Sequence, residues 1–390
     1  MTDLVALRRE LHRAPEVGLQ LPKTQARLLR ELEGLPLEVT TGAALTSITA
    51  VLRGGAHDGN GRVVLLRADM DALPVTEQTG LDYASTNGAM HACGHDLHMA
   101  MLVGAARHLS AQRDELPGDV VFMFQPGEEG NNGAGIMIDE GILEAAGRRA
   151  DQAFALHVWA AHMPPGLFTS RPGTVMSTSG TLDVTIRGKG GHGSTPHLAK
   201  DPVPAMAEMI TSLQVLVTRN VDVFDPAVIT VGRVAAGTAR NVIPATAEFN
   251  ATIRAFSRET QDRVFELIGP LLTGIASAHG VEVDIDLERD YPATVNDEAS
   301  VQLARRAVRD EFGDDRWADL AHPMNASEDF SRVLEAVPGA FLLYSAVAAD
   351  ADPATLENNH SPLARYDDSV LVDGAHLLAE VARRSLRGEA

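Results

Sequence analysis

The sequence predicts an α/β fold in which a mixed-sheet domain is interrupted by a smaller α+β domain of ferredoxin-like order βαββαβ. The N-terminal and C-terminal parts alternate helical patterns with short, nearly continuous apolar runs, which are typical of strands buried on both faces of a sheet. The part between them has strands with regular apolar–polar alternation, which indicates an antiparallel sheet with one solvated face. A length of 390 residues is sufficient for two domains.

The composition is that of an ordinary globular protein, and it excludes some classes of partner. The formal net charge of −20 would repel a phosphate backbone, so we expect no nucleic-acid partner. No apolar run approaches the length that spans a bilayer, and the first residues lack the apolar region of a secretory signal, so we expect no membrane partner. The single cysteine, Cys93, excludes an intramolecular disulfide and fits a reducing compartment, which predicts a cytoplasmic protein.

The first elements lead to a strand that ends in two carboxylates. Periodicity predicts helices over residues 3–13 and 23–32 and strands over residues 46–53 and 62–68. The last of these strands is apolar almost throughout and runs directly into Asp69 and Asp71. Open α/β sheets bind ligands at the carboxyl ends of such strands, although two turn-forming aspartates would produce the same pattern.

A cluster of metal-binding residue types follows at residues 91–98. It contains three histidines, an aspartate and the only cysteine, and Gly94 lets the backbone bend between Cys93 and His95. A predicted helix over residues 97–109 places the cluster at a helix N-terminus, where the dipole favours a thiolate. Taken alone, the cluster is explained equally well by an inert, buried cysteine.

Two more buried strands end in acids or histidines. The strand predicted over residues 119–125 leads to Glu128 and Glu129, which are costly to place together without a cation. A helix is expected over residues 133–146. The next strand, over residues 152–158, carries His157 near its carboxyl end, where a core histidine is the plainer explanation. Because three successive strands deliver such groups at the same end, we predict a site there.

The pattern changes at about residue 179 and returns to α/β at about residue 290. The expected elements between are strands over residues 180–188, 227–234, 246–256 and 281–287 and helices over 202–218 and 257–279. Their order matches the ferredoxin-like arrangement. We therefore predict a discontinuous catalytic domain of residues 1–178 and 290–390 with an inserted domain of residues 179–289.

Three polar positions in the inserted domain are candidate functional residues. His192 lies among four glycines, where turn formation alone would not require a histidine. Asn241 lies in a polar loop between two strands and is a candidate contact to a carbonyl or an anion. Arg254 lies within a strand on the parity opposite to the apolar residues, so solvent exposure explains it equally well.

The C-terminal part completes the sheet and adds one more histidine. The pattern predicts helices over residues 301–312 and 369–384, a polar turn at residues 324–330 that opens a helix, and a buried strand over residues 340–346. His360 lies in the loop after that strand, again beyond a strand's carboxyl end.

The converging residues form a mixed set of sulfur, nitrogen and oxygen ligands: Cys93, His95, Glu129, His157 and His360. Such a set suits Zn²⁺, Mn²⁺ or Co²⁺ and is a poor match for Mg²⁺ or Ca²⁺. Five ligands exceed the four of a closed structural zinc site, which indicates two metals or one metal with spare ligands. Glu128 is then a candidate general base, and Asp71 is a candidate to orient a ligating histidine.

The sequence resembles the M20 family of metallopeptidases and amidohydrolases over essentially its whole length. Within that family it is similar to the aminoacylase, hippurate hydrolase and indole-acetyl-amino-acid hydrolase branch. The resemblance rests on RADMDALP at 67–74, MHACGHD at 90–96, QPGEE at 125–129, GGHGS at 190–194, RNVIP at 240–244, SEDF at 327–330 and NHSP at 359–362. Relatives of the peptidase branch have an aspartate where Cys93 stands, so the cysteine favours the amide-hydrolase branch.

The resemblance implies a di-metal enzyme that cleaves the amide bond of N-acyl amino acids, such as N-acetyl or N-benzoyl derivatives. The five ligands would hold two divalent ions per subunit, Zn²⁺ or Mn²⁺ with Co²⁺ or Ni²⁺ as other candidates, and Glu128 would be the base. It also implies a homodimer formed through the inserted domain, which would serve as a lid, with His192 from the partner subunit polarising the scissile carbonyl. Asn241 and Arg254 would hold the substrate carbonyl and carboxylate.

Two alternative functions stay open at this point. One is a dipeptidase, or a deacetylase of an N-acetylated diamino acid, within the same family. The other is a non-catalytic metal sensor with a redox-active Cys93. Glu128 and His192 argue against a sensor, because a sensor requires neither a base nor a carbonyl-polarising group.

Overall fold

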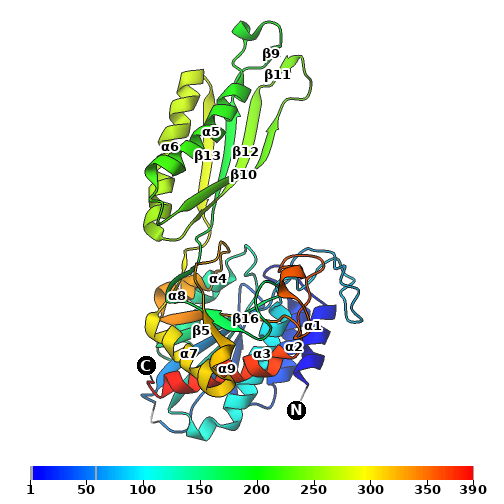
Figure 1. Cartoon of the computed structure of the whole chain (residues 1–390), viewed down its shortest axis with the longest axis vertical. Helices are drawn as coiled ribbons and strands as arrows, with labels where there is room; N and C mark the ends of the chain where they lie inside the picture. The colour runs from blue at the N-terminus through cyan, green and yellow to red at the C-terminus, as the bar shows by residue number, and fades with distance from the viewer. Residues whose placement is uncertain (1–2, 58, 390) are drawn as a thin grey trace. The chain divides into compact units, whose positions relative to one another are not determined.

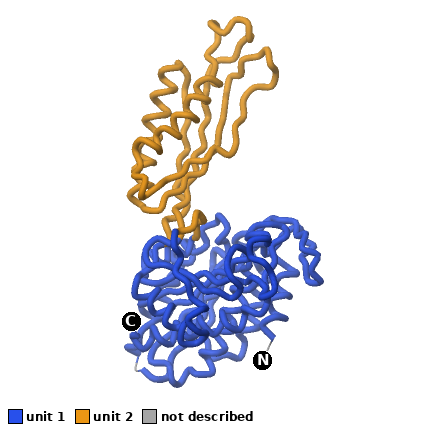
Figure 2. The backbone as a smooth tube through the Cα atoms, in the orientation of Figure 1, with its two compact units in different colours: residues 1–175, 295–322, 329–390 blue, residues 176–294, 323–328 orange. Residues whose placement is uncertain are grey.

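The computed structural model describes residues 3–57 and 59–389, and the chain divides into two compact units. Unit 1 comprises residues 1–175, 295–322 and 329–390, and unit 2 comprises residues 176–294 and 323–328 (Figure 2). The insertion predicted over residues 179–289 falls within unit 2. Residues 323–328, which the sequence analysis assigns to the other domain, also group with unit 2.

Unit 1 is built on an eight-stranded sheet of order β1-β2-β4-β3-β5-β16-β6-β15. The strands are β1 (Leu37–Thr41), β2 (Ile48–Leu52), β3 (Arg62–Asp69), β4 (Gly118–Gln125), β5 (Gln152–Trp159), β6 (Phe168–Ser170), β15 (Trp317–Asp319) and β16 (Gly339–Ser345). The central strands β4, β3, β5 and β16 are parallel neighbours, whereas β1, β2 and β6 pair antiparallel with β2, β4 and β16. The predicted mixed sheet is therefore confirmed.

The helices of unit 1 supply most of its hydrophobic core. They are α1 (Leu4–Arg13), α2 (Pro22–Leu32), α3 (His95–Ala111), α4 (Gly133–Asp139), α7 (Glu298–Phe312), α8 (Ser331–Ala336) and α9 (Val370–Leu386). One continuous cluster of buried apolar side chains, which includes Phe122 and Phe154, joins α1, α2, α3, α7 and α9 to the sheet. Helix α3 is apolar on nearly every side, as expected for a helix enclosed by its neighbours.

Two predictions for unit 1 are wrong in detail. The helix expected over residues 133–146 ends at Asp139, because Gly141 adopts a φ of 91° that no helix continues. Strands β1, β6 and β15 were not predicted from the sequence. Strand β1 is largely exposed, and β6 and β15 have three residues each, so these strands carry no apolar period to detect.

Unit 2 contains a four-stranded antiparallel sheet of order β10-β12-β8-β13 with α5 and α6 packed against it (Figure 1). Its elements are β8 (Gly180–Arg187), β9 (Gly191–His192), α5 (Pro202–Asn220), β10 (Ala227–Ala236), β11 (Val242–Ile243), β12 (Thr246–Ala255), α6 (Arg258–His279) and β13 (Glu282–Arg289). This is the strand order of a ferredoxin-like fold. The strands β7 (Gly173–Met176) and β14 (Thr294–Asn296) lie where the chain passes between the units.

The topology of unit 1 brings the candidate residues to one edge of the sheet. Strands β3, β4 and β5 are parallel, so their carboxyl ends lie at the same edge. Asp69 ends β3, the two glutamates follow β4, and His157 lies near the end of β5. None of the helices that the structure describes is long and apolar enough to cross a membrane.

Candidate metal centre

The thiol of Cys93 lies at the middle of the predicted ligand set. Its Sγ atom is 3.5 Å from Nε2 of His157 and 3.3 Å from Nε2 of His360. The same His360 nitrogen lies 3.2 Å from Oε1 of Glu129. Residues from a helix N-terminus, a strand end and two loops, up to 267 positions apart in the chain, thus meet around one sulfur atom.

His95 completes the set with a ring nitrogen that faces the cluster. It is the first residue of α3, and its Nδ1 lies 2.8 Å from the carbonyl oxygen of Asp71. This contact assigns the proton to Nδ1, because a carbonyl oxygen only accepts. Nε2 is buried and has no hydrogen-bond partner among the described residues. Ligand atoms of Cys93, His95 and Glu129 all lie within 4.8 Å of one another.

Neighbouring backbone groups fix the other two histidines. Nδ1 of His157 lies 2.9 Å from its neighbour's carbonyl oxygen, that of Val158, so Nε2 presents its lone pair to Cys93. His360 adopts a φ of 71°, and its backbone N–H donates to Ala92 at 2.8 Å. A left-handed backbone costs a non-glycine residue roughly 1 kcal/mol or more, and such strain gathers at functional sites. The strained turn holds His360 against the segment that carries Cys93.

These spacings and donors fit a metal centre. Ligands at about 2.0–2.3 Å from a tetrahedral ion lie roughly 3.3–3.6 Å from one another. The separations in the structure, 3.2, 3.3 and 3.5 Å, are close to that range. The buried, unpartnered Nε2 of His95 is a second indication, since a buried polar atom without a partner is costly. The thiolate, imidazole and carboxylate donors suit zinc and manganese better than magnesium or calcium.

The pKa values of two candidate ligand histidines also favour a cation at this cluster. Hydrogen bonds to Cys93 and Glu129 raise the pKa of His360 to about 10. Burial lowers the pKa of His157 well below its ordinary value of 6.5. The two histidines that contact Cys93 Sγ therefore differ in charge, and a divalent cation would replace the proton that His360 otherwise holds.

The candidate base and its neighbour are positioned by Asp71. Its two carboxylate oxygens accept the backbone N–H groups of Glu128 at 3.0 Å and of Glu129 at 3.1 Å. Glu128 is buried. Asp71 thus contacts a candidate ligand as expected, but its carbonyl oxygen orients His95 while its carboxylate holds the glutamate loop.

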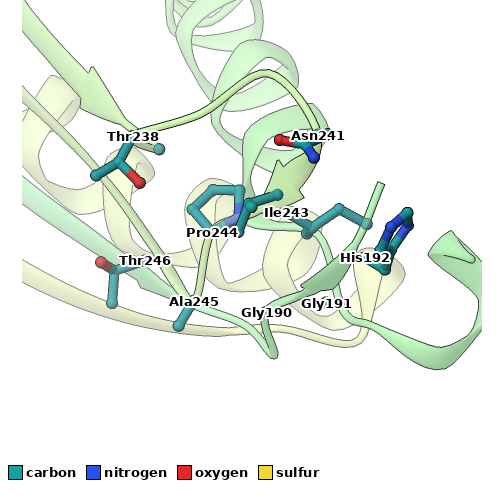
Figure 3. Close-up of a pocket in the computed structure, with 11 residues that line it drawn as sticks. Gly190, Gly191, His192, Thr238, Asn241, Ile243, Pro244, Ala245 and Thr246 are labelled. Carbon is teal, nitrogen blue, oxygen red and sulfur yellow. The ribbon is translucent and has the colours of Figure 1, made fainter. Parts of the chain in front are cut away.

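His192 and Asn241 share a pocket within unit 2. The pocket has a volume of about 680 Å³, and its walls come from residues 190–192, 237–238 and 241–246. His192 and Asn241 are among the residues that line it (Figure 3). Strands β9 and β11 pair there, with His192 opposite Val242. The Ser194 backbone N–H donates to Nδ1 of His192 at 3.2 Å, so Nε2 is the ring nitrogen that carries a proton. His192 can therefore donate one hydrogen bond from Nε2.

Arg254 lies at the end of β12 opposite to the pocket residue Thr246. Its Nη1 donates to Oγ of Ser327 at 2.6 Å, and the side chain is half-buried. Plain solvent exposure, the alternative from strand parity, is therefore wrong. Burial lowers the pKa of the guanidinium, which stays cationic.

The sequence matches the family described as "Peptidase family M20/M25/M40" over residues 65–384. The chain belongs to this family. The prediction from the motifs that the chain is an M20 metallo-amidohydrolase is confirmed.

Three proteins illustrate what this M20 chain is similar to. "IAA-amino acid hydrolase ILR1-like 2" of Arabidopsis thaliana is 36% identical over 99% of this chain and 86% of its own length. "N-acetyldiaminopimelate deacetylase" of Geobacillus sp. (strain WCH70) is 37% identical over 87% of this chain and 88% of its own. A Bacillus subtilis structure, described as a dinuclear metal-binding peptidase of the M20 family, is 31% identical with a TM-score of 0.83. That comparison covers 98% of this chain and 97% of the other.

A buried network behind the candidate metal centre was not predicted from the sequence. Arg67 lies within β3 and is 2% exposed. It donates to Asp69 at 2.6 Å, to Asp329 at 3.1 Å and to Gln125 at 2.9 Å. Nδ1 of His98 lies 2.6 Å from the other oxygen of Asp69. An arginine inside an apolar strand was the available signal, because a buried guanidinium requires carboxylate partners.

A second missed cluster anchors the start of α3. Asp96 follows the candidate ligand His95, and its Oδ2 lies 2.7 Å from Nε of Arg8 and 2.8 Å from Nδ1 of His12. All three side chains are buried. The charges of α1 thus fix the helix turn that carries His95 in this M20 chain.

Proposed function

We propose that this chain is a metal-dependent hydrolase of N-acyl amino acids, which it cleaves to a carboxylate and a free amino acid. The observation that carries the proposal is the convergence of Cys93, His95, Glu129, His157 and His360 beside the buried Glu128. The names of the plant hydrolase and the bacterial deacetylase both describe removal of an acyl partner from an amino acid. Both proteins resemble this chain over most of its length.

Two divalent ions per chain are part of this proposal. The similar Bacillus subtilis protein is described as a dinuclear metal-binding peptidase, and five candidate ligands are too many for one closed tetrahedral site. Cys93 contacts two candidate ligands, His157 and His360, as a bridging thiolate would. The donor set favours Zn²⁺ or Mn²⁺, with Co²⁺ or Ni²⁺ as other candidates.

Glu128 is the proposed general base. When bound, the ions supply Lewis-acid polarisation of the scissile carbonyl and lower the pKa of water. The Glu128 carboxylate takes the proton of the attacking water and delivers it to the leaving nitrogen. The Asp71 carboxylate accepts the Glu128 backbone N–H at 3.0 Å. This hydrogen bond restricts the loop, so the Glu128 carboxylate is already positioned before the substrate binds.

Side chains of unit 2 are proposed to bind the substrate. His192 donates from Nε2 to the scissile carbonyl oxygen, and Asn241 donates from its amide to the same developing oxyanion. Arg254 binds the carboxylate of the amino-acid half by charge-assisted hydrogen bonds. The pocket shared by His192 and Asn241 supports their joint role.

We also propose a cytoplasmic homodimer formed through unit 2, which serves as the lid, with His192 acting in the partner subunit's site. His192 is exposed on its own unit, which supports action on a substrate held elsewhere. A reducing compartment would keep the thiolate ligand Cys93 from oxidation.

A second candidate is deacetylation of an N-acetylated diamino acid. The 37% identity to the Geobacillus deacetylase favours it. The chemistry is the same, and only the side chain of the amino-acid half differs.

Amine release from a panel of substrates tests the proposal. The panel contains N-acetyl, N-benzoyl and N-indoleacyl amino acids, N-acetyldiaminopimelate and dipeptides. Each is assayed with chelator-treated protein and again after addition of Zn²⁺, Mn²⁺, Co²⁺ or Ni²⁺. Turnover that depends on metal and on an N-acyl group supports the proposal. Metal-independent turnover, or none on any N-acyl compound by metal-loaded protein, contradicts it.

A further inference from the structure

We propose that Asp69 is a sixth protein ligand of the metal centre and binds the same ion as His95. This inference rests on the proposed di-metal function and adds a residue to its ligand set. Asp69 is the last residue of β3 and is fully buried. Its Oδ2 lies 3.5 Å from Nε2 of His95, the nitrogen that has no hydrogen-bond partner in the part of the chain described.

The separation of these two atoms fits a shared ion better than a shared proton. A charge-assisted hydrogen bond between imidazolium and carboxylate would bring them to about 2.7–2.9 Å. Two ligands at about 2.0–2.2 Å from one tetrahedral ion lie roughly 3.4 Å apart. Oδ2 of Asp69 and Nε2 of His95 are 3.5 Å apart, the same distance as between Cys93 Sγ and His157 Nε2.

His98 is excluded as the ligand although it lies in the same group of four. Ligand atoms of Asp69, His95, His98 and His157 all lie within 4.8 Å of one another. However, Nε2 of His98 accepts the backbone N–H of Val158 at 2.8 Å, so its lone pair is already used. Its proton is therefore on Nδ1, which donates to Oδ1 of Asp69 at 2.6 Å.

The hydrogen bonds of Asp69 leave room for a cation at Oδ2. Oδ1 is engaged by His98, and Oδ2 accepts from Arg67 at 2.6 Å. A carboxylate oxygen has two lone pairs, so Oδ2 can accept from Arg67 and also bind an ion. Ligating carboxylates are commonly fixed by such hydrogen bonds.

The assignment makes the two metal positions unequal. Asp69, His95 and His157, with the shared Cys93, would fill the four positions of one ion. The other ion would have Glu129, His360 and Cys93, which leaves a position open for water or substrate. The open position would lie on the side of Glu129, adjacent in sequence to the proposed base.

A crystal structure of the full-length protein loaded with Zn²⁺ tests the inference directly. We expect the ion on His95 to lie about 2.0–2.2 Å from Oδ2 of Asp69. An ion on His95 that is more than about 3 Å from Asp69 would overturn the inference but leave the proposed di-metal function intact. Absence of any ion from the cluster, with saturating zinc present, would overturn the proposed function as well.

Metal titration of two matched variants gives a second readout. Asp69→Asn should bind one of two Zn²⁺ equivalents at least about tenfold more weakly than the parent protein. Asp329→Asn removes the other carboxylate partner of Arg67 and should leave both equivalents unchanged. Unchanged binding in Asp69→Asn, or equal weakening in both variants, would contradict a ligand role. If neither variant folds, the zinc-loaded structure of the parent protein decides.

Discussion

The side chain of Asp71 holds the main chain of Glu129, because Oδ2 of Asp71 accepts the Glu129 backbone N–H at 3.1 Å. The other oxygen accepts the N–H of Glu128 at 3.0 Å. One side chain therefore sets the position of both a proposed metal ligand and the proposed base. Both N–H groups point at a carboxylate, which is a stronger acceptor than a carbonyl.

Replacing that acceptor should lower turnover without unfolding the chain. Asp71→Asn would direct an amide NH₂ at one of the two backbone N–H groups, and the loop would shift. We expect kcat to fall by about 10–100-fold, as for other residues that orient metal ligands. Steady-state kinetics with metal-saturated protein measure the effect. Asp119→Asn is the control, because Asp119 accepts the N–H of Gly54 at the opposite end of β4.

Removing the proposed base should separate metal binding from catalysis. Glu128→Gln keeps the shape of the side chain and cannot take a proton, so kcat should fall by about 10²–10⁴-fold. Metal content, measured on the same preparation, should stay at the parent value. Glu129→Gln should instead lose metal, because it removes a charged ligand 3.2 Å from His360. Parent-like turnover in Glu128→Gln would remove Glu128 from the base role.

Metal affinity should rise with pH, because a metal ion must displace a proton from His360. Hydrogen bonds to Cys93 and Glu129 raise the pKa of His360 to about 10 in the metal-free protein. Below that pH the ring holds a proton that a metal ion must displace. Apparent affinity for Zn²⁺ should therefore increase between about pH 6.5 and 9, with proton release on binding. Titration calorimetry in two buffers of different ionisation enthalpy measures that release.

The matched variant for this pH dependence is His360→Gln. It should bind metal more weakly and release fewer protons per ion. Equal proton release by the two proteins would show that another group is the source.

Sequence patterns predicted the strands that end at the candidate metal centre. They did not predict which side chains contact one another there. The apolar runs of β3, β4 and β5 placed Asp69, Glu129 and His157 at one edge, because parallel strands end together. The choice between His95 and His98 was not available from spacing. Both begin α3, and only the fold shows that Val158 occupies Nε2 of His98.

Contacts between residues far apart in the chain could also not be predicted from the sequence. Arg67 meets Asp329 across 262 positions, and no local period encodes that contact. The end of α4 at Asp139 depended on the backbone angle of one glycine, Gly141, in a stretch whose composition still favours a helix.

Mixed dimers should show whether His192 acts on the partner subunit's substrate. Glu128→Gln and His192→Ala should each be inactive alone. If His192 acts across the dimer, a mixed dimer has one site with an intact base and an intact histidine, and the other site lacks both. Random exchange of equal amounts should then restore about a quarter of the parent activity, because half of the dimers are mixed and each has one working site.

Action within one chain predicts a different outcome for the same mixture. Each chain would then carry one defect, and no combination of subunits would restore activity. Subunit exchange is checked by two affinity tags, one on each variant, so that a lack of recovery reflects chemistry and not failure to mix. Nδ1 of His192 accepts the N–H of Ser194 at 3.2 Å, which leaves Nε2 as the hydrogen-bond donor. We therefore also expect His192→Gln to retain more activity than His192→Ala. Glutamine retains a hydrogen-bond donor for the scissile carbonyl, whereas alanine retains none.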